Sequence, residues 1–403
     1  MSKRRLRVLV LSWNYPTPAA PHRGLWVERM CRAAALAADV TVIVPTPWVP
    51  PLIPIPALAR FMHVPHYERQ GNVEVYFPRV AGSIEYYTHV LDASLASARV
   101  LALARRLHKE RPFDVIHAHF IYPDGVVASR LGRELGVPVM TSEHAFWTPW
   151  LLDQPRVAAQ VERALPGIRL VTAVSDFLRQ SVQAYARDRI ETAVLPNVVD
   201  DAIFTPAPRE RDTTQLLYVG LIRKFKRIDV LLHALARVRR TLPKLRLRVL
   251  SANAFRAYGS DRREMHELVS RLGLGDIVSI EPGADPPAVA EAMRRCALVA
   301  VSSTRRETFC SVAAEALACG TPLIITRCGG PEEFVTAADG VMVEPDDPEA
   351  FARGILEALQ RRETFDSGGM CRRIVGRFGT VAWCDGAMAT YERVAASSTW
   401  RVQ

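Results

Sequence analysis

Two glutamates in the stretch ETFCSVAAEALACGTP, residues 307–322, lie where a loop passes into a buried helix. Glu307 falls in the loop after the strand-like run LVAVSS, and Ser311 is the expected N-cap of the helix. Backbone N–H groups and the positive end of a helix dipole bind anions at such a place. Glu315 follows four residues after Ser311, where its oxygens can accept hydrogen bonds from vicinal hydroxyls, as the ribose-binding acid of dinucleotide folds does. The alternative is a solvated Glu307 and a capping Glu315.

A basic loop follows the strand QLLYVG at 215–220. It contains four cations: Arg223, Lys224, Lys226 and Arg227. Two cations beside a helix N-terminus can neutralise a departing diphosphate when no metal does so. The chain has no D-x-D motif. The alternative is a basic turn on an ordinary surface.

Histidines occur at the ends of two further strand-like runs. In DVIHAH, His117 and His119 point to the same side, and His119 lies at the end of the strand. TSEHAF places Glu143 and His144 at the end of another strand. We expect His119 to handle a proton or bond a substrate hydroxyl, His144 to lie on the acceptor side, and His117 to be a core histidine. A zinc site is the alternative, although no thiols accompany these residues.

The first loop that follows a strand, NYPTPAAPHRGLWVERM, contains Gly24 directly before a helix. Glycine permits a backbone to lie against a bulky ligand, so we expect the loop at Gly24 to open into the cleft where ligands bind. No G-x-G-x-x-G, G-x-S-x-G or P-loop motif is present, and a nicotinamide or flavin dinucleotide is therefore not indicated.

The strands that carry these residues alternate with helical patterns, as in parallel βαβ units. In the first half, we predict strands at 5–12, 40–45, 113–119, 137–143 and 170–175, with helices at 25–38 and 94–110. In the second half, we predict strands at 215–220, 245–250, 277–280, 298–303, 322–327 and 340–344, and a helix with an apolar stripe from Ile228 to Val238. Each half therefore reads as a Rossmann-like sheet.

The length of 403 residues suits two sizeable domains. The predicted fold class is α/β, with two facing Rossmann-like domains and a cleft outside the carboxyl ends of both sets of strands. We predict an N-terminal domain over 1–195, a Pro-rich linker over 196–212, a C-terminal domain over 213–380 and a last helix over 381–403 that crosses back to the N-terminal domain.

Most of the net charge of +10 comes from residues 1–189. A basic half suits nucleic acid, an anionic membrane or an acidic substrate, and a solvated Arg-rich face is the alternative. Nucleic acid is not expected, because the basic residues are not interleaved with aromatics as a readout surface. The apolar and basic segment 45–71 is either a mobile loop at the mouth of the cleft or a loop folded on its own domain.

Seven cysteines without a C-x-x-C pair indicate neither a disulfide framework nor a zinc ribbon, and they suit a reducing compartment. The apolar run near the N-terminus is about seven residues long and lacks a small-residue cleavage site, so a first strand is favoured over a signal peptide. No apolar stretch approaches the roughly 20 residues that span a bilayer. We expect a cytoplasmic protein, with peripheral contact at the inner face of the cell membrane as a further hypothesis.

Several motifs together resemble the family 4 glycosyltransferases, which are retaining enzymes with the GT-B fold. They are ETFCSVAAEALACGTPLI, CGGPEEFV, YVGLIRKFKRIDVLLHAL, LPNVVDDAIF and DVIHAHFIYPDG. The resemblance implies a hexosyltransferase that moves a sugar from a UDP- or GDP-linked donor to an acceptor hydroxyl, without a metal or other cofactor, in polysaccharide or glycolipid biosynthesis. The donor would bind the C-terminal domain, and a saccharide or lipid-linked acceptor would bind the N-terminal domain, with domain closure completing the site.

The resemblance also implies roles for individual residues. Glu315 would bind the nucleotide ribose, and Glu307 would contact the donor sugar and stabilise the transition state. Lys226 matches the diphosphate-binding lysine, His119 the histidine that contacts the transferred hexose, and Gly24 the glycine-rich loop on the acceptor side. Further donor contacts are expected from Arg223 and from the backbone of Phe309, Cys310 and Ser311.

Three positions depart from the family pattern. Leu221 stands where the family usually has arginine, and Cys310 and Val198 stand where it usually has glycine. Because Leu221 removes a cation from the departing diphosphate, its binding would fall to Lys226 with help from Arg223. A nucleotide-sugar epimerase and a non-catalytic nucleotide-sugar-binding protein remain alternatives with the same fold, and no oligomeric state is predicted.

Overall fold

The computed structural model describes residues 4–48, 60–80, 93–146, 153–206, 210–251 and 259–396. The chain divides into two compact units, Met1–Val198 with Val381–Gln403, and Val199–Thr380. The sequence predicted a separate linker over 196–212, whereas this division assigns most of that segment to the second unit.

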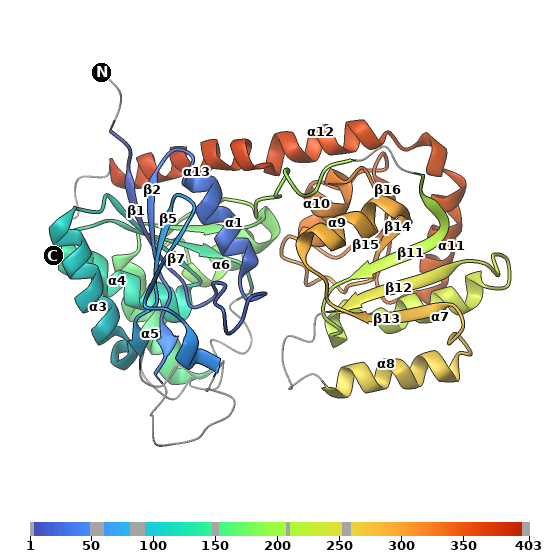
Figure 1. Ribbon diagram of the computed structural model, residues 1–403, viewed down its shortest axis with the longest axis horizontal. Coiled ribbons are helices and arrows are strands. Elements are labelled where there is room, and N and C mark those ends of the chain that lie inside the picture. Colours follow the sequence, from blue (N-terminus) through green and yellow to red (C-terminus); the bar gives the residue numbers. More distant parts are fainter. Residues whose placement is uncertain are drawn as a thin grey trace. The chain divides into compact units, whose positions relative to one another are not determined.

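The first unit is an α/β sheet with helices packed against it (Figure 1). Its strands are β1 (Arg7–Leu11), β2 (Asp39–Ile43), β3 (Thr46–Pro47), β4 (Tyr67–Gln70), β5 (Val73–Tyr76), β6 (Arg79–Val80), β7 (Val115–His119), β8 (Val139–Glu143), β9 (Leu170–Ala173) and β10 (Glu191–Val194). Its helices are α1 (Leu25–Ala34), α3 (Ala93–Glu110), α4 (Val126–Leu135), α5 (Pro155–Ala164), α6 (Asp176–Ala186) and α13 (Thr380–Ala395), the last of which belongs to this unit from Val381 onward.

The main sheet of this unit has the strand order β10-β9-β8-β7-β1-β2-β5-β4. Its strands pair in parallel except in the hairpin β4–β5. The chain runs from β1 toward β2 on one side and returns to the other side of β1 at β7. Ligands bind open α/β sheets at such a reversal, outside the carboxyl ends of the strands.

The core of the first unit is formed by β1, β2 and β5 together with α1 and α13. Every residue of β1 is buried, as expected for a parallel strand covered on both faces. Trp383 and Tyr391 of α13 are almost fully buried in this core. Helix α1 ends at Ala34 rather than at residue 38, because the chain turns there and Arg5 donates hydrogen bonds to the carbonyls of Ala35 and Ala38.

The segment 45–71 packs on the first unit where the structure describes it. It contains β3, a 3₁₀ turn (Arg60–His63) and β4, and both Phe61 and Val64 lie in the hydrophobic core. For these residues the interpretation as a segment folded on its own domain is confirmed, and the hairpin β4–β5 was not predicted. Residues 49–59 lie outside the described part of the chain.

The second unit is built on a six-stranded, fully parallel sheet with the strand order β13-β12-β11-β14-β15-β16. Its strands are β11 (Asp212–Val219), β12 (Arg246–Ser251), β13 (Val278–Pro282), β14 (Cys296–Val301), β15 (Leu323–Thr326) and β16 (Gly340–Val343). Its helices are α7 (Ile228–Val238), α8 (Gly259–Arg271), α9 (Pro286–Arg295), α10 (Ser311–Ala318), α11 (Pro348–Gln360) and α12 (Ser367–Phe378). Here the strand order reverses between β11 and β14.

The predicted apolar stripe of α7 is confirmed, because its residues are all buried in the core of this unit. They are Ile228, Leu231, Leu232, Leu235 and Val238. No helix in the described part of the chain is both long and apolar enough to cross a membrane.

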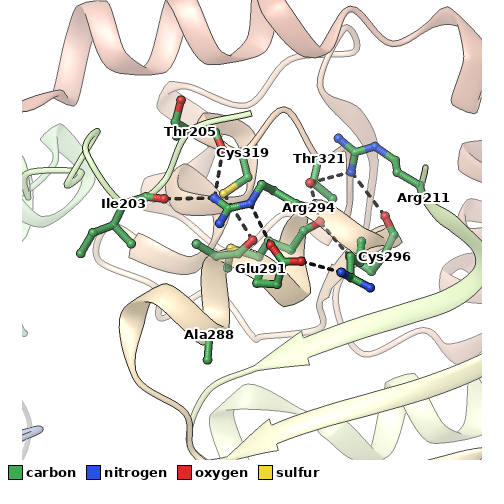
Figure 2. A network of polar contacts seen from close by, with 12 residues as sticks. Ile203, Thr205, Arg211, Ala288, Glu291, Arg294, Cys296, Cys319 and Thr321 are labelled. Carbon is green, nitrogen blue, oxygen red and sulfur yellow. Dashed lines mark hydrogen bonds and ion pairs between the residues drawn. The ribbon is translucent and has the colours of Figure 1, made fainter. Parts of the chain in front are cut away.

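Two arginines hold the chain segment that leads into β11, Arg211 from within this segment and Arg294 from α9 (Figure 2). Arg211 donates to the hydroxyl of Thr321 and to the carbonyl of Gly320, in each case over 2.7 Å. Arg294 of α9 donates to the carbonyls of Ile203 and Thr205, each over 3.1 Å. The motif ACGTP therefore anchors the helix that carries Glu315 to the chain segment leading into β11.

Candidate active site

Two loops of the second unit meet because they follow adjacent strands. β11 and β14 pair in parallel, so the loops at their carboxyl ends, 220–227 and 302–310, lie at the same edge of the sheet. The backbone N–H of Thr304 donates to the carbonyl of Phe225 over 2.8 Å, and the hydroxyl of Ser302 donates to the carbonyl of Lys226 over 2.9 Å. The sheet topology thus brings the basic loop to the glutamate loop.

Glu307 is held by two donors at this junction. Lys226 Nζ lies 2.6 Å from Glu307 Oε1, and the hydroxyl of Ser303 donates to the same oxygen over 2.5 Å. Glu307 is 6% exposed and Ser303 is 1% exposed. Burial disfavours the ammonium of Lys226, but the negatively charged forms of the groups around it, above all the carboxylate of Glu307, together raise the pKa of Lys226 above its usual value. Lys226 therefore stays protonated near neutral pH. Ser303 was not among the predicted site residues, although it ends the predicted strand only four residues before Glu307.

The segment after β15, which contains Gly329 and Gly330, is hydrogen-bonded to the backbone of the glutamate loop. Glu307 N donates to the carbonyl of Cys328 over 2.9 Å, and Gly330 N donates to the carbonyl of Glu307 over 2.8 Å. A Cβ at Gly330 would lie 2.2 Å from the carbonyl oxygen of Thr308, so only glycine fits there. The motif CGG thus fixes the backbone around Glu307.

The predicted N-cap at Ser311 is wrong. Ser311 is the first residue of α10, and the capping position is held by Cys310, whose φ of 63° lies in the left-handed region. The chain turns sharply at Cys310 directly before the helix, and the side chain there makes no capping hydrogen bond. The departure from glycine at this position therefore places a non-glycine residue in a conformation that glycine adopts more easily.

The thiol of Cys310 lies among the predicted donor residues. Burial, together with the carboxylate of Glu307, raises its pKa to about 12, with Lys226 acting in the opposite direction and Glu315 adding to the rise. Glu307 and Glu315 are therefore both close enough to act on the same thiol. Glu315 itself is 7% exposed on α10.

The side chain of Phe309 is taken up by packing. Its ring centroid lies 5.4 Å from that of Phe334 and 5.2 Å from that of Phe378. Phe309 is 2% exposed, so only its backbone is left to contact a ligand, which is the kind of contact the sequence predicted for it.

The basic loop contains Arg223, a predicted donor contact, and Leu221, which stands where the family usually has arginine. Arg223 is half-buried and directly precedes the short 3₁₀ turn Lys224–Lys226. The carbonyl of Leu221 accepts a hydrogen bond from the hydroxyl of Tyr218 over 3.1 Å. Lys226 is thus the cation that contacts Glu307, while Lys224 is exposed.

In the first unit, the structure brings His119 and His144 together. His119 Nδ1 lies 3.0 Å from His144 Nε2, and the two rings stack with centroids 5.2 Å apart. His144 Nδ1 lies 3.3 Å from the amide oxygen of Asn197. Burial lowers the pKa of His119 well below its usual value and that of His144 to about 4. Both rings are therefore neutral near neutral pH.

His117 is a satisfied core histidine, as predicted. Its Nδ1 lies 2.9 Å from the hydroxyl of Tyr391, and its Nε2 lies 2.7 Å from the hydroxyl of Ser142. Within the described residues, no group of three or more His, Cys, Asp or Glu side chains is arranged to hold a metal ion.

The group that lies close to Gly24 is the backbone carbonyl of Asn14. Gly24 has a φ of 66° at the start of α1, and a Cβ there would lie 2.1 Å from the carbonyl oxygen of Asn14. Glycine is therefore required by the turn of the first loop, and a ligand contact at Gly24 stays a prediction. His119 and Gly24 lie in the first unit, and the predicted donor residues lie in the second.

Comparison with known proteins assigns the chain to a family. The profile described as "Glycosyltransferase Family 4" matches residues 26–203, and "Glycosyl transferases group 1" matches residues 200–367. A D-inositol 3-phosphate glycosyltransferase of Geodermatophilus obscurus is 32% identical over 317 residues, which are 72% of this chain and 70% of that protein. The chain belongs to the family 4 glycosyltransferases. The corresponding protein of Frankia alni is 30% identical over 309 residues, covering 70% of this chain and 75% of that one.

Solved structures show that this family 4 glycosyltransferase has the predicted GT-B fold. A sucrose-phosphate synthase from Thermosynechococcus elongatus matches with a TM-score of 0.74 and 20% identity, over 98% of this chain and 100% of that one. HepE of Anabaena, solved in complex with UDP and glucose, matches with a TM-score of 0.72 and 20% identity, over 96% of this chain and 100% of that one. The prediction that the chain is a glycosyltransferase is confirmed. The roles of its individual residues remain predictions.

Proposed function

We propose that this glycosyltransferase moves a sugar from a nucleoside diphosphate sugar to an acceptor hydroxyl with retention of the anomeric configuration. The observation that carries the proposal is the pair of Lys226 and Glu307 beside the N-terminus of α10. An ammonium has three N–H donors, so Lys226 can hold Glu307 and also meet an oxygen of the diphosphate. The charge on that oxygen grows as the sugar leaves, and a fixed cation stabilises it most at that moment.

Glu307 and Glu315 are proposed to contact different parts of the donor. Glu307, anchored by Lys226 and Ser303, would face the sugar where positive charge develops as its bond to the diphosphate breaks. Glu315, on the first turns of α10, would accept hydrogen bonds from the ribose hydroxyls. The backbone N–H groups at the start of α10 would bind phosphate.

We further propose that the reaction needs no metal ion. Lys226, Arg223 and the start of α10 supply positive charge within one loop cluster of the second unit, as a departing diphosphate requires. Transfer should therefore continue in excess chelator and gain nothing from added Mg²⁺ or Mn²⁺. Loss of turnover in chelator that added Mg²⁺ or Mn²⁺ restores would contradict this part of the proposal.

The donor is proposed to be a UDP-hexose. Anabaena HepE was solved with UDP and glucose, and a trehalose-phosphate synthase of Burkholderia vietnamiensis with a TM-score of 0.69 is described as UDP-forming. A mass-spectrometric screen of UDP-, GDP- and ADP-sugars with saccharide, polyol phosphate and lipid-linked acceptors should show consumption of one donor, and NMR of the product should show retention. Conversion of a donor sugar without acceptor would indicate an epimerase, and binding without transfer would indicate a non-catalytic protein.

A lipid-linked saccharide at an anionic membrane surface, as in polysaccharide or glycolipid biosynthesis, is the proposed acceptor. Trp48, Met62 and Tyr67 are 47%, 55% and 45% exposed in the described part of segment 45–71, and the net positive charge lies mainly in the same half of the chain. Apolar side chains and basic charge together favour anionic bilayers. The protein should sediment with phosphatidylglycerol vesicles and less with phosphatidylcholine vesicles, and replacing Trp48 and Met62 by alanine should weaken this. Equal recovery with both lipids would contradict it.

A further inference from the structure

Three side chains of the first unit form a hydrogen-bonded row that ends at His119. His119 is the last residue of β7, His144 follows β8, and Asn197 follows β10, so each member of the row lies at the carboxyl end of a strand of the same sheet. The amide oxygen of Asn197 lies 3.3 Å from His144 Nδ1, and His144 Nε2 lies 3.0 Å from His119 Nδ1.

The number of protons in this row fixes the roles of its nitrogens. A neutral imidazole carries one N–H, and its other nitrogen is an acceptor. Burial lowers the pKa of His119 and of His144, so both rings are neutral near neutral pH. The amide oxygen of Asn197 can only accept, so His144 Nδ1 carries the proton and His144 Nε2 is bare. His144 Nε2 then accepts from His119 Nδ1–H, and His119 Nε2 is left as an acceptor.

We propose that Asn197 is a positioning residue that, through His144, makes His119 present a bare Nε2 to the substrate. The group that meets this nitrogen must donate a hydrogen bond through an O–H or N–H, as a sugar hydroxyl does. A phosphate or carboxylate oxygen there would set lone pair against lone pair and leave the nitrogen unsatisfied. The row therefore determines specificity as well as geometry. Only the assignment of the hydroxyl to a sugar substrate rests on the proposed function.

The backbone that carries Asn197 is fixed at the two residues before it. Leu195 N donates to the carbonyl of Ala173 in β9 over 2.9 Å, and the indole N–H of Trp383 in α13 donates to the carbonyl of Pro196 over 2.7 Å. Asn197 is therefore held in place by packing that does not involve the histidines.

The neighbouring His117 differs from His119 in its hydrogen bonds. Both of its ring nitrogens are bonded within the core, to Tyr391 and Ser142, so it offers none to a ligand. The ring centroids of His117 and His119 lie 4.5 Å apart. Of the two, His119 is the one that is hydrogen-bonded through His144 to the amide of Asn197. The contrast separates the histidine that has a ring nitrogen left to accept a hydrogen bond from the one whose nitrogens are both bonded.

The tautomer of His119 tests the proposal directly in the full-length, unliganded protein. Long-range ¹H–¹⁵N NMR of ¹⁵N-histidine-labelled protein at about pH 8 distinguishes protonated from bare ring nitrogens, with assignment by His119→Gln and His144→Gln. We expect Nδ1–H on His119 and a bare Nε2. An Nε2–H on His119 in the wild type would overturn the proposal.

Variants at Asn197 separate positioning from a merely structural role. Asn197→Ala removes the acceptor and should leave His119 as a mixture of tautomers, whereas Asn197→Asp keeps an oxygen acceptor and should restore the wild-type spectrum. Asn72→Ala, an exposed amide in the same unit, should change nothing. An unchanged His119 spectrum in Asn197→Ala would contradict the proposal. Because no turnover is needed, this result stands apart from the proposed function, for which kcat/KM of Asn197→Ala should fall about tenfold and recover in Asn197→Asp.

Discussion

Lys226 and Glu307 form a short ion pair although 81 positions separate them in the chain, with Nζ 2.6 Å from Oε1. The contact exists because the loops after β11 and β14 lie at the same edge of one sheet. Among the described residues, the hydrogen bonds to this carboxylate from Lys226 and Ser303 both reach Oε1. Oε2 is therefore the oxygen that we expect to face the donor sugar.

Glu307→Gln should abolish most of the turnover. The amide keeps the size of the side chain but removes the charge that we expect to stabilise the sugar in the transition state, so kcat should fall by about 10²–10³-fold. Initial rates with the donor found in the screen provide the measurement. Glu349→Gln, which changes an exposed carboxylate on α11, serves as control and should keep wild-type turnover. A Glu307→Gln rate within about twofold of wild type would remove Glu307 from the mechanism.

Ser303→Ala should reduce turnover without changing the protonation of Lys226. The variant loses one of the two hydrogen bonds that orient Glu307, so we expect kcat to fall about tenfold with little change in the KM for the donor. Thr304→Val is the matched control, because the buried hydroxyl of Thr304 has no hydrogen-bond partner among the described residues. Steady-state kinetics of both variants give the comparison. Similar rates for the two variants would mean that Ser303 does not position Glu307.

Much of the second-unit cluster could be predicted because it depends on periodicity and strand order. The alternation of apolar runs gives the strands, and the reversal between β11 and β14 then brings Lys226 and Glu307 to one edge. The bond from Ser303 could not be predicted, because a rotamer within a loop leaves no periodic pattern. The same holds for Cys310, whose backbone angle is set by how the chain enters α10.

The first unit was harder to predict. His144 was placed near the acceptor by its position after a strand, but its contact with His119 depends on the parallel register of β7 and β8. Gly24 was predicted to let the backbone lie against a ligand, yet a sequence cannot say whether the close neighbour is a ligand or the carbonyl of Asn14. The strand β10 was missed, because its short, partly exposed sequence has no clear apolar pattern.

Exchanges at Cys310 should reveal its backbone strain. A β-branched side chain at a φ of 63° is strongly disfavoured, so Cys310→Val should be about 2 kcal/mol less stable than Cys310→Gly. Thermal unfolding of both variants measures the difference. At Cys371, inside α12, the valine variant should instead be more stable than the glycine variant, because glycine is the poorer helix residue. Equal unfolding temperatures for the two Cys310 variants would contradict a strained turn.

Acid should destabilise the first unit through its buried histidines. Burial, with a smaller effect from His144, lowers the pKa of His117 to about 3, whereas an unfolded histidine titrates near 6.5. Below about pH 6.5 the unfolded state binds more protons than the folded state, so stability falls as the pH falls, by about 1.4 kcal/mol per pH unit for each such histidine.

Urea unfolding at about pH 7 and pH 5 checks this direction. His117→Asn should show a weaker dependence on pH than the wild type, and His266→Gln, at an exposed position of α8, should not. A wild-type unfolding free energy that rises on acidification would contradict the neutral core histidines.

The central claim is that Lys226 meets the departing diphosphate, since Leu221 supplies no cation in the same loop. The most direct measurement compares the turnover of Lys226→Ala with that of Lys224→Ala, which removes an exposed lysine two residues away. We predict a fall of about 10²–10³-fold in kcat for Lys226→Ala and less than about twofold for Lys224→Ala. Equal turnover in the two variants would contradict the assignment of the donor site.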